Sequence, residues 1–234
     1  MSDKELINLI KKKKAMQMIL RCYKEISDDI SVIKDRDPAA RSSAEILLLY
    51  SGLHAILAYR LSHMLYKRGY LFAARLISQS ARHLTGIEIH PGAKIGKGVF
   101  IDHGSGVVIG ETAVVGNNCT LYQGVTLGGT GKDTGKRHPT LGDNVMVGAG
   151  AKVLGPFEVG SNTKIAANAV VLAPLPENST AVGIPARIVR KDGKKITKEI
   201  DLDQVHMPDP VSQELCRMQV KINQLEKKLK ELEK

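Results

Sequence analysis

The chain has 234 residues, enough for one large domain or two small ones, and is 43% hydrophobic but only 4% aromatic, without Trp. A core must therefore be built from aliphatic side chains. The net charge of +10 permits an anionic partner. The lysines are scattered, however, and no helix-turn-helix or stacking-aromatic motif accompanies them, so nucleic acid is not expected.

Three further observations bear on the compartment. The longest apolar runs, such as ILLLY at 46–50, are too short to cross a bilayer, so no membrane partner is expected. Cys22, Cys119 and Cys216 are far apart and form no C-x-x-C pair, which favours reduced thiols over a disulfide framework or a zinc site. The start MSDKELINLIKKKK lacks the order of a secretory signal. We expect a cytoplasmic protein without a bound metal.

Residues 1–86 are predicted to form an α-helical N-terminal domain. Ranges 3–34 and 38–84 are typical of helices, and in the second range aliphatic residues recur at steps of three and four. Asp37-Pro38 predicts a helix start, because an acidic cap precedes a proline in the first turn. Gly69 and Gly86 interrupt the pattern.

From residue 87 to 190 the period changes to six. Six is a multiple of two, so each hexad returns a side chain to the same face of an extended strand, and glycines permit the turns. The repeat predicts a parallel β-helix of a little over four coils, with three hexads in each coil. The aliphatic positions are Ile89, Ile95, Ile101, Ile109, Val115, Leu121, Leu127, Leu141, Val147, Val153, Val159, Ile165 and Val171; four residues after most of them come Ala93, Ser105, Ala113, Cys119, Val125, Ala151, Thr163 and Ala169.

This repeat slips twice. The step from Ile101 to Ile109 is eight residues, and the step from Leu127 to Leu141 is fourteen. A solenoid accommodates such insertions as loops at its corners, and loops on a rigid scaffold often carry chemistry. The first slip follows Asp102-His103 and the second contains Arg137-His138, so both loops are candidates for a functional site.

The C-terminal part is predicted to be a linker, 191–211, and an amphipathic or coiled-coil helix, 212–234, begun by Asp209-Pro210. Apolar residues from Leu215 to Leu232 keep spacings of three and four, and Lys221–Glu226 and Lys228–Glu233 would attract between chains of a parallel coiled coil. A parallel homo-oligomer is favoured. A single amphipathic helix packing on its own domain is the alternative.

The stretch GIEIHPGAKIG, with DHG, LGGTGK and KRHP after it, resembles the serine acetyltransferases, and the similarity runs from about Asp37 to Val189. The resemblance implies a left-handed β-helix, an exception to the usual right-handed crossover. It also implies a homotrimer with active sites between neighbouring subunits, and leaves a dimer of trimers open. The implied reaction transfers acetyl from acetyl-CoA to the hydroxyl of L-serine, giving O-acetyl-L-serine and CoA.

The resemblance also assigns site residues. His103 is the candidate base, since a serine hydroxyl needs one and imidazole titrates near neutrality; Glu88, where the family has Asp, is its expected carboxylate partner. Asp37 and Asp102 would hold the serine ammonium, and Arg137 and His138 its carboxylate. The CoA channel would comprise Gly129, Thr130, Ala149, Lys164, Ala167 and Arg187. From the residues alone, Asp37 is also explained as a helix cap and Glu88 as a solvated strand end.

The family often ends in a tail, closing with Ile, that docks into the next enzyme of the pathway, O-acetylserine sulfhydrylase. This chain ends ELEK, so that complex is not predicted. Feedback inhibition by L-cysteine is an expectation of the resemblance alone.

Other functions stay open. An acetyltransferase of the same architecture could act on a sugar or another hydroxyl. A solenoid metalloenzyme such as a carbonic anhydrase needs three zinc-binding histidines; His90, His103 and His138 are available, but that family's His pair at five-residue spacing is missing. A non-catalytic scaffold would leave the ionisable loops unexplained.

Overall fold

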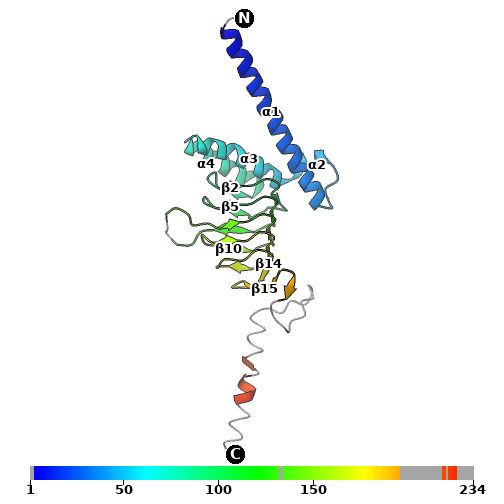
Figure 1. Cartoon of the computed structure of the whole chain (residues 1–234), viewed down its shortest axis with the longest axis vertical. Coiled ribbons are helices and arrows are strands. Elements are labelled where there is room, and N and C mark those ends of the chain that lie inside the picture. The colour runs from blue at the N-terminus through cyan, green and yellow to red at the C-terminus, as the bar shows by residue number, and fades with distance from the viewer. Residues whose placement is uncertain (1–2, 132–133, 196–217, 220, 226–234) are drawn as a thin grey trace, which may run out of the picture.

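A computed structural model describes residues 3–131, 134–195, 218–219 and 221–225. Figure 1 shows a long N-terminal helix projecting from a group of helices that covers one end of a β-solenoid. The helices are α1 (Asp3–Arg36), α2 (Ser43–Leu49), α3 (Ser51–Lys67) and α4 (Leu71–Thr85). The helical character predicted for the N-terminal region is confirmed.

The predicted helix start at Asp37-Pro38 is wrong. α2 begins only at Ser43, because Ser42 accepts a hydrogen bond from the Glu45 N–H at 3.1 Å. The Glu45 carboxylate in turn accepts one from the Arg41 N–H at 3.2 Å. These two bonds satisfy N–H groups that a helix start leaves without partners.

The helical range predicted over 38–84 is broken at two points, one unexpected and one at the predicted interruption Gly69. At Tyr50 the backbone is extended (φ −84°, ψ 104°), and α2 and α3 bend by 66° relative to each other. The second break lies after Lys67, where Gly69 has a φ of 84°. Within the described residues, no helix alone has the length and apolar character to span a membrane; α2 and α3 reach that threshold only as a bent pair.

The solenoid has three faces, which are three sheets of parallel strands. Sheet A contains β1 (Glu88–Ile89), β4 (Val108–Ile109), β7 (Thr126–Gly128), β10 (Lys152–Leu154) and β13 (Val170–Val171). Sheet B contains β2 (Lys94–Ile95), β5 (Val114–Val115), β8 (Thr140–Leu141) and β11 (Glu158–Val159). Sheet C contains β3 (Phe100–Ile101), β6 (Thr120–Leu121), β9 (Met146–Val147), β12 (Lys164–Ile165) and β14 (Ser179–Val182).

The aliphatic ladder predicted from the hexads forms the core. Every predicted aliphatic position is buried except Ile95, which packs against the core and is partly buried. Each fully buried Val, Leu or Ile side chain contributes about 1.5–3 kcal/mol relative to an exposed one. One predicted small position is wrong: Ser105 is exposed, and Val107 takes the inward place. The two extra residues at this corner shift the inward position.

The insertions leave the strand register intact, as predicted. Ile89 pairs with Ile109 across the first slip, and Leu127 pairs with Val153 across the second. The first insertion lies between β3 and β4, where sheet C turns into sheet A; we call this the C/A corner. The second lies between β7 and β8, at the A/B corner, and its loop projects from the side of the solenoid in Figure 1.

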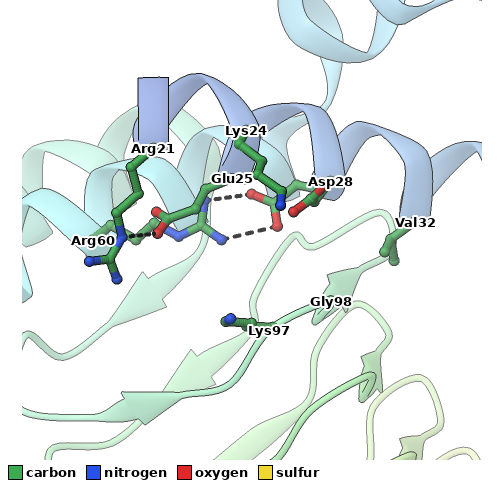
Figure 2. A pocket seen from close by; sticks show the side chains of 9 residues that line it. Arg21, Lys24, Glu25, Asp28, Val32, Arg60, Lys97 and Gly98 are labelled. Atoms are coloured by element: carbon green, nitrogen blue, oxygen red, sulfur yellow. Dashed lines mark hydrogen bonds and ion pairs between the residues drawn. The ribbon is translucent and has the colours of Figure 1, made fainter. Parts of the chain in front are cut away.

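Charged contacts hold α1 on the rest of the molecule. Asp29 of α1 is buried and accepts two hydrogen bonds from Arg60 of α3, at 2.5 and 3.0 Å. Both residues line a cavity of about 320 Å³, together with Lys97 of the β2–β3 turn. Figure 2 shows Arg60 and Lys97 at this cavity. At the end of α1, Arg36 donates to the Asn118 carbonyl at 3.1 Å. This last contact holds the C-terminal end of α1 against the solenoid, just before Asp37.

At the other end of the solenoid, sheet C continues into two antiparallel strands. β15 (Arg187–Lys191) pairs with β14, and β16 (Lys194–Lys195) pairs with β15. These strands reach into the range predicted as a linker. Most of the predicted coiled coil lies outside the described residues; within it, 218–219 and 221–225 are helical and exposed.

Candidate active site

The C/A corner carries Asp102 and His103. The His103 side chain is 73% exposed, and its Nε2 lies 3.9 Å from Asp102 Oδ1. Its backbone is left-handed (φ 57°), in a tight turn that Gly104 continues (φ 68°). The imidazole therefore stands on the outside of the solenoid, where an incoming molecule can reach it.

Asp37 lies at the same corner. Its carboxylate accepts hydrogen bonds from the Tyr50 hydroxyl at 2.7 Å and from the Ala39 N–H at 2.8 Å. Both bonds stabilise the ionised form, so the pKa of Asp37 is lowered, with a further contribution from nearby His103. The hydrogen bond to Asp37 also raises the pKa of Tyr50, to about 12. We call Asp37, Asp102 and His103 the base corner.

Glu88 has partners other than the base. It lies on β1 in sheet A, where its carboxylate is 3.1 Å from Arg82 Nη1 and accepts a 3.4 Å hydrogen bond from Gln79 Nε2. Arg82 and Gln79 both belong to α4. In the described part of the chain, Asp102 is the acid found within ion-pair distance of His103. A role for Glu88 beside the base stays a prediction.

The A/B corner holds Arg137 and His138 in a defined arrangement around Thr112. Thr112 Oγ1 accepts hydrogen bonds from the N–H groups of Arg137 at 3.0 Å and His138 at 3.1 Å. Because those bonds occupy its lone pairs, the hydroxyl proton is donated to His138 Nδ1, 2.8 Å away. The Thr112 N–H also donates to Nδ1, at 3.2 Å. Nδ1 is thus an acceptor, and the ring proton of neutral His138 resides on Nε2.

The electrostatics of this corner favour that neutral donor. Burial, followed by the charge of Arg137, lowers the pKa of His138. Arg137 in turn donates to the Glu111 carboxylate, and this bond lowers the pKa of Glu111. The contact uses one branch of a guanidinium that has five N–H donors. We call Arg137 and His138 the carboxylate clamp, because the sequence predicts that they bind the serine carboxylate and both carry N–H donors suited to an anion.

Sequence reasoning missed Glu111, Thr112 and Tyr50. The first two could have been found from the repeat: Glu111 and Thr112 lie 26 residues before Arg137 and His138. One undisturbed coil is 18 residues, as in the pairing of Ile109 with Leu127, and the second slip adds eight. Residues one coil apart at one corner are neighbours. Nothing in the sequence indicated Tyr50, which acts across a helix break.

The residues expected to bind CoA lie at the two corners and on sheet C. Ala149 and Ala167 lie at the C/A corner, on later coils than His103, and the Asn168 N–H donates to the Ala149 carbonyl at 2.8 Å. Gly129 and Thr130 belong to the A/B loop and are exposed. Lys164 on β12 and Arg187 on β15 are exposed on sheet C.

The base corner and the carboxylate clamp therefore lie at different corners of the solenoid. Within one chain they form two half-sites rather than a single pocket. The three histidines considered for a zinc site are divided in the same way, since His90 and His138 lie at the A/B corner and His103 lies at the C/A corner. The described residues contain no group of three His, Cys, Asp or Glu side chains arranged for a metal.

Comparison with known proteins identifies the family. Residues 1–58 match the family model described as "Serine acetyltransferase, N-terminal", and residues 138–173 match "Bacterial transferase hexapeptide (six repeats)". The serine acetyltransferase of Bacillus licheniformis is 56% identical over 212 residues, which are 91% of this chain and 97% of the relative.

Solved structures of serine acetyltransferases are also similar to this chain. The Neisseria gonorrhoeae serine acetyltransferase in complex with serine is 43% identical, with a TM-score of 0.70 over 73% of this chain and 70% of that one. A serine acetyltransferase in complex with cysteine is 45% identical, with a TM-score of 0.72 over 76% and 74%. The left-handed β-helix expected from the sequence is confirmed. Hexads, helical cap and close relatives agree: the chain belongs to the serine acetyltransferase family.

Proposed function

We propose that this protein transfers the acetyl group of acetyl-CoA to the hydroxyl of L-serine, giving O-acetyl-L-serine and CoA, at sites between neighbouring subunits of a homotrimer. The division of the site into two half-sites at different corners of one coil carries the proposal. A contact between the C/A corner of one subunit and the A/B corner of the next joins unlike surfaces, and such contacts form a ring when the rotation between subunits closes. Three copies would complete three sites.

Each half-site supplies one part of serine recognition. The base corner offers the ammonium group two carboxylates, Asp37 and Asp102. The clamp offers the carboxylate group the Arg137 guanidinium and the Nε2–H of His138. A neutral sugar would offer no opposite charge to either set, so the two half-sites favour an amino acid over a sugar acceptor.

The chemistry follows from that placement. His103 takes the proton of the serine hydroxyl as its oxygen attacks the thioester carbonyl. The tetrahedral intermediate then collapses, the C–S bond breaks, and His103 returns the proton to the CoA sulfur. In this proposal Glu88 supports the imidazolium, and the CoA lies along the C/A corner past Ala149 and Ala167, with Lys164 and Arg187 near its phosphates.

L-cysteine is included as a competing ligand, because it differs from serine only in carrying a thiol for the hydroxyl and would meet the same charges. A relative has been solved with cysteine bound. The reaction is placed in the cytoplasm, where free thiols such as Cys22 and Cys119 persist. A dimer of trimers is the larger assembly, and the exposed Phe72 and Leu84 of α4 would be available for it.

Mixed subunits test the shared site. His103→Ala and Arg137→Ala chains are each expected to be inactive alone in a thiol-release assay with acetyl-CoA and L-serine. Co-expressed with distinct tags, they should recover about one quarter of wild-type activity, because random assortment pairs an intact base corner with an intact clamp at about one site in four. Recovery absent from purified mixed trimers would refute the shared site. Wild-type inactivity with L-serine would refute the function itself.

A further inference from the structure

The junction between α2 and α3 lies directly on the base corner. Gly52, in the first turn of α3, is so close to β3 that a Cβ atom would come within 2.2 Å of the Ile101 carbonyl oxygen. This contact places the junction beside Asp102, the next residue. Ser51 Oγ also lies 3.5 Å from the His103 carbonyl oxygen. The helix break and the base corner are therefore one packed unit.

Tyr50 occupies the break itself. Its extended backbone ends α2 and allows α3 to start in a new direction. The side chain is partly buried, and its hydroxyl donates to Asp37 Oδ2 at 2.7 Å. A longer α2 that continued through residue 50 would not hold the ring in this orientation.

The Asp37 carboxylate is fixed at both oxygens. Oδ1 accepts from the Ala39 N–H at 2.8 Å, and Oδ2 accepts from Tyr50. A carboxylate has about four lone-pair directions, so each oxygen keeps capacity for a further donor. Two fixed bonds stop the carboxylate from rotating and set the direction in which that capacity points.

We propose that Tyr50 is a positioning residue for amino-group recognition: its hydroxyl orients Asp37 so that the carboxylate meets the substrate ammonium. The inference rests on the proposed function, in which Asp37 binds that ammonium. Tyr50 does not touch the reacting atoms and acts through Asp37. Its removal should therefore weaken serine binding and leave the acetyl transfer step unchanged.

The test is Tyr50→Phe, which keeps the ring and deletes the hydroxyl. The KM for L-serine should rise roughly tenfold, as for loss of a hydrogen bond to a charged group. The kcat and the KM for acetyl-CoA should stay at wild-type values. Tyr70→Phe, at an exposed tyrosine before α4, is the matched control and should change neither constant.

Two further readouts separate positioning from a merely structural role. The inhibition constant of 3-hydroxypropanoate, which has the hydroxyl and carboxylate of serine but no amino group, should be the same in Tyr50→Phe and wild type. In an Asp37→Asn background, adding Tyr50→Phe should raise the serine KM by much less than tenfold, because the two residues act in series.

The outcomes are distinct from those of the proposed function. If wild type acetylates L-serine but Tyr50→Phe keeps the wild-type serine KM, the inference is wrong and the function stands. A fall in kcat at unchanged KM, or equal weakening of 3-hydroxypropanoate and serine, also overturns it. Inactivity of wild type with L-serine defeats the function before Tyr50 is tested.

Discussion

The two corners that interrupt the hexads are built differently. At the C/A corner two extra residues leave the His103 side chain 73% exposed, with Asp102 at 3.9 Å as its ion-pair partner. At the A/B corner eight extra residues bring His138 to 8% exposure, held by Thr112. The corner with the shorter insertion presents a side chain, whereas the end of the longer one, at Arg137 and His138, is bonded to the coil before it.

This difference indicates how the proposed site is assembled. Each chain prepares the carboxylate clamp by itself, since every bond that orients it comes from the same corner one coil earlier. The base receives much less support from its own chain, and a neighbouring subunit would complete its surroundings. Substitutions at the two corners should therefore fail in different ways.

The largest effect is expected at the base. His103→Ala should lower kcat with L-serine by about 10²- to 10⁴-fold, because the hydroxyl loses its general base. The serine KM should change far less, since the variant keeps the charged residues that bind the ammonium and carboxylate groups of serine. Thiol release under saturating acetyl-CoA measures both constants, and His83→Ala on α4 is the matched control. Activity near wild type in purified His103→Ala would remove the base from the mechanism.

A smaller effect is expected when the carboxylate clamp loses the Thr112 hydroxyl that orients it. Thr112→Val keeps the side-chain shape but removes the hydroxyl that bonds His138 and two backbone N–H groups. The serine KM should rise about tenfold, with kcat much less affected. Thr112→Ser, which retains the hydroxyl, should stay close to wild type. Equal KM values for the Val and Ser variants would show that the hydroxyl does not orient the clamp.

The smallest effect concerns stability and pH. Burial lowers the pKa of folded His138 below its ordinary value of 6.5, so as pH falls below that value the unfolded chain takes up its proton first. The free energy of unfolding should therefore decrease between about pH 7.5 and about pH 5.5. In His138→Asn the decrease should be smaller, as measured by denaturant titration at both pH values. Equal decreases in the free energy of unfolding of the two proteins would contradict a lowered pKa of His138 as the cause.

The interior of the solenoid was predictable because every inward position has the same surroundings. Each aliphatic residue stacks between equivalents one coil away, so six-residue spacing alone identifies it. Ser105 was misplaced because an insertion within a corner changes the count between strand and turn. The helix boundaries failed for a different reason: Asp37-Pro38 and Ser42 through Glu45 both have the residues of a helix start, and the hydrogen bonds of the second cap form in the structure.

The positions of the candidate site residues were easier to predict than their contacts, and their roles stay predictions. The ionisable residues at the two slips were visible in the sequence, since the pattern breaks there. The contact of Thr112 with His138 depends on how an eight-residue excess folds back, and that of Glu88 with Arg82 depends on how α4 lies over β1. Such contacts arise between elements whose relative placement no local pattern determines.

The antiparallel strands β15 and β16 bear on solubility. A stack of parallel strands ends in unpaired backbone groups, and another molecule could extend the stack indefinitely. Here, in the described part of the chain, sheet C ends in the reversed strand β16, which carries the exposed Lys194, while helices cover the opposite end of the stack. The charge of Lys194 at this edge disfavours addition of a second copy to sheet C, which limits fibrous growth through that sheet.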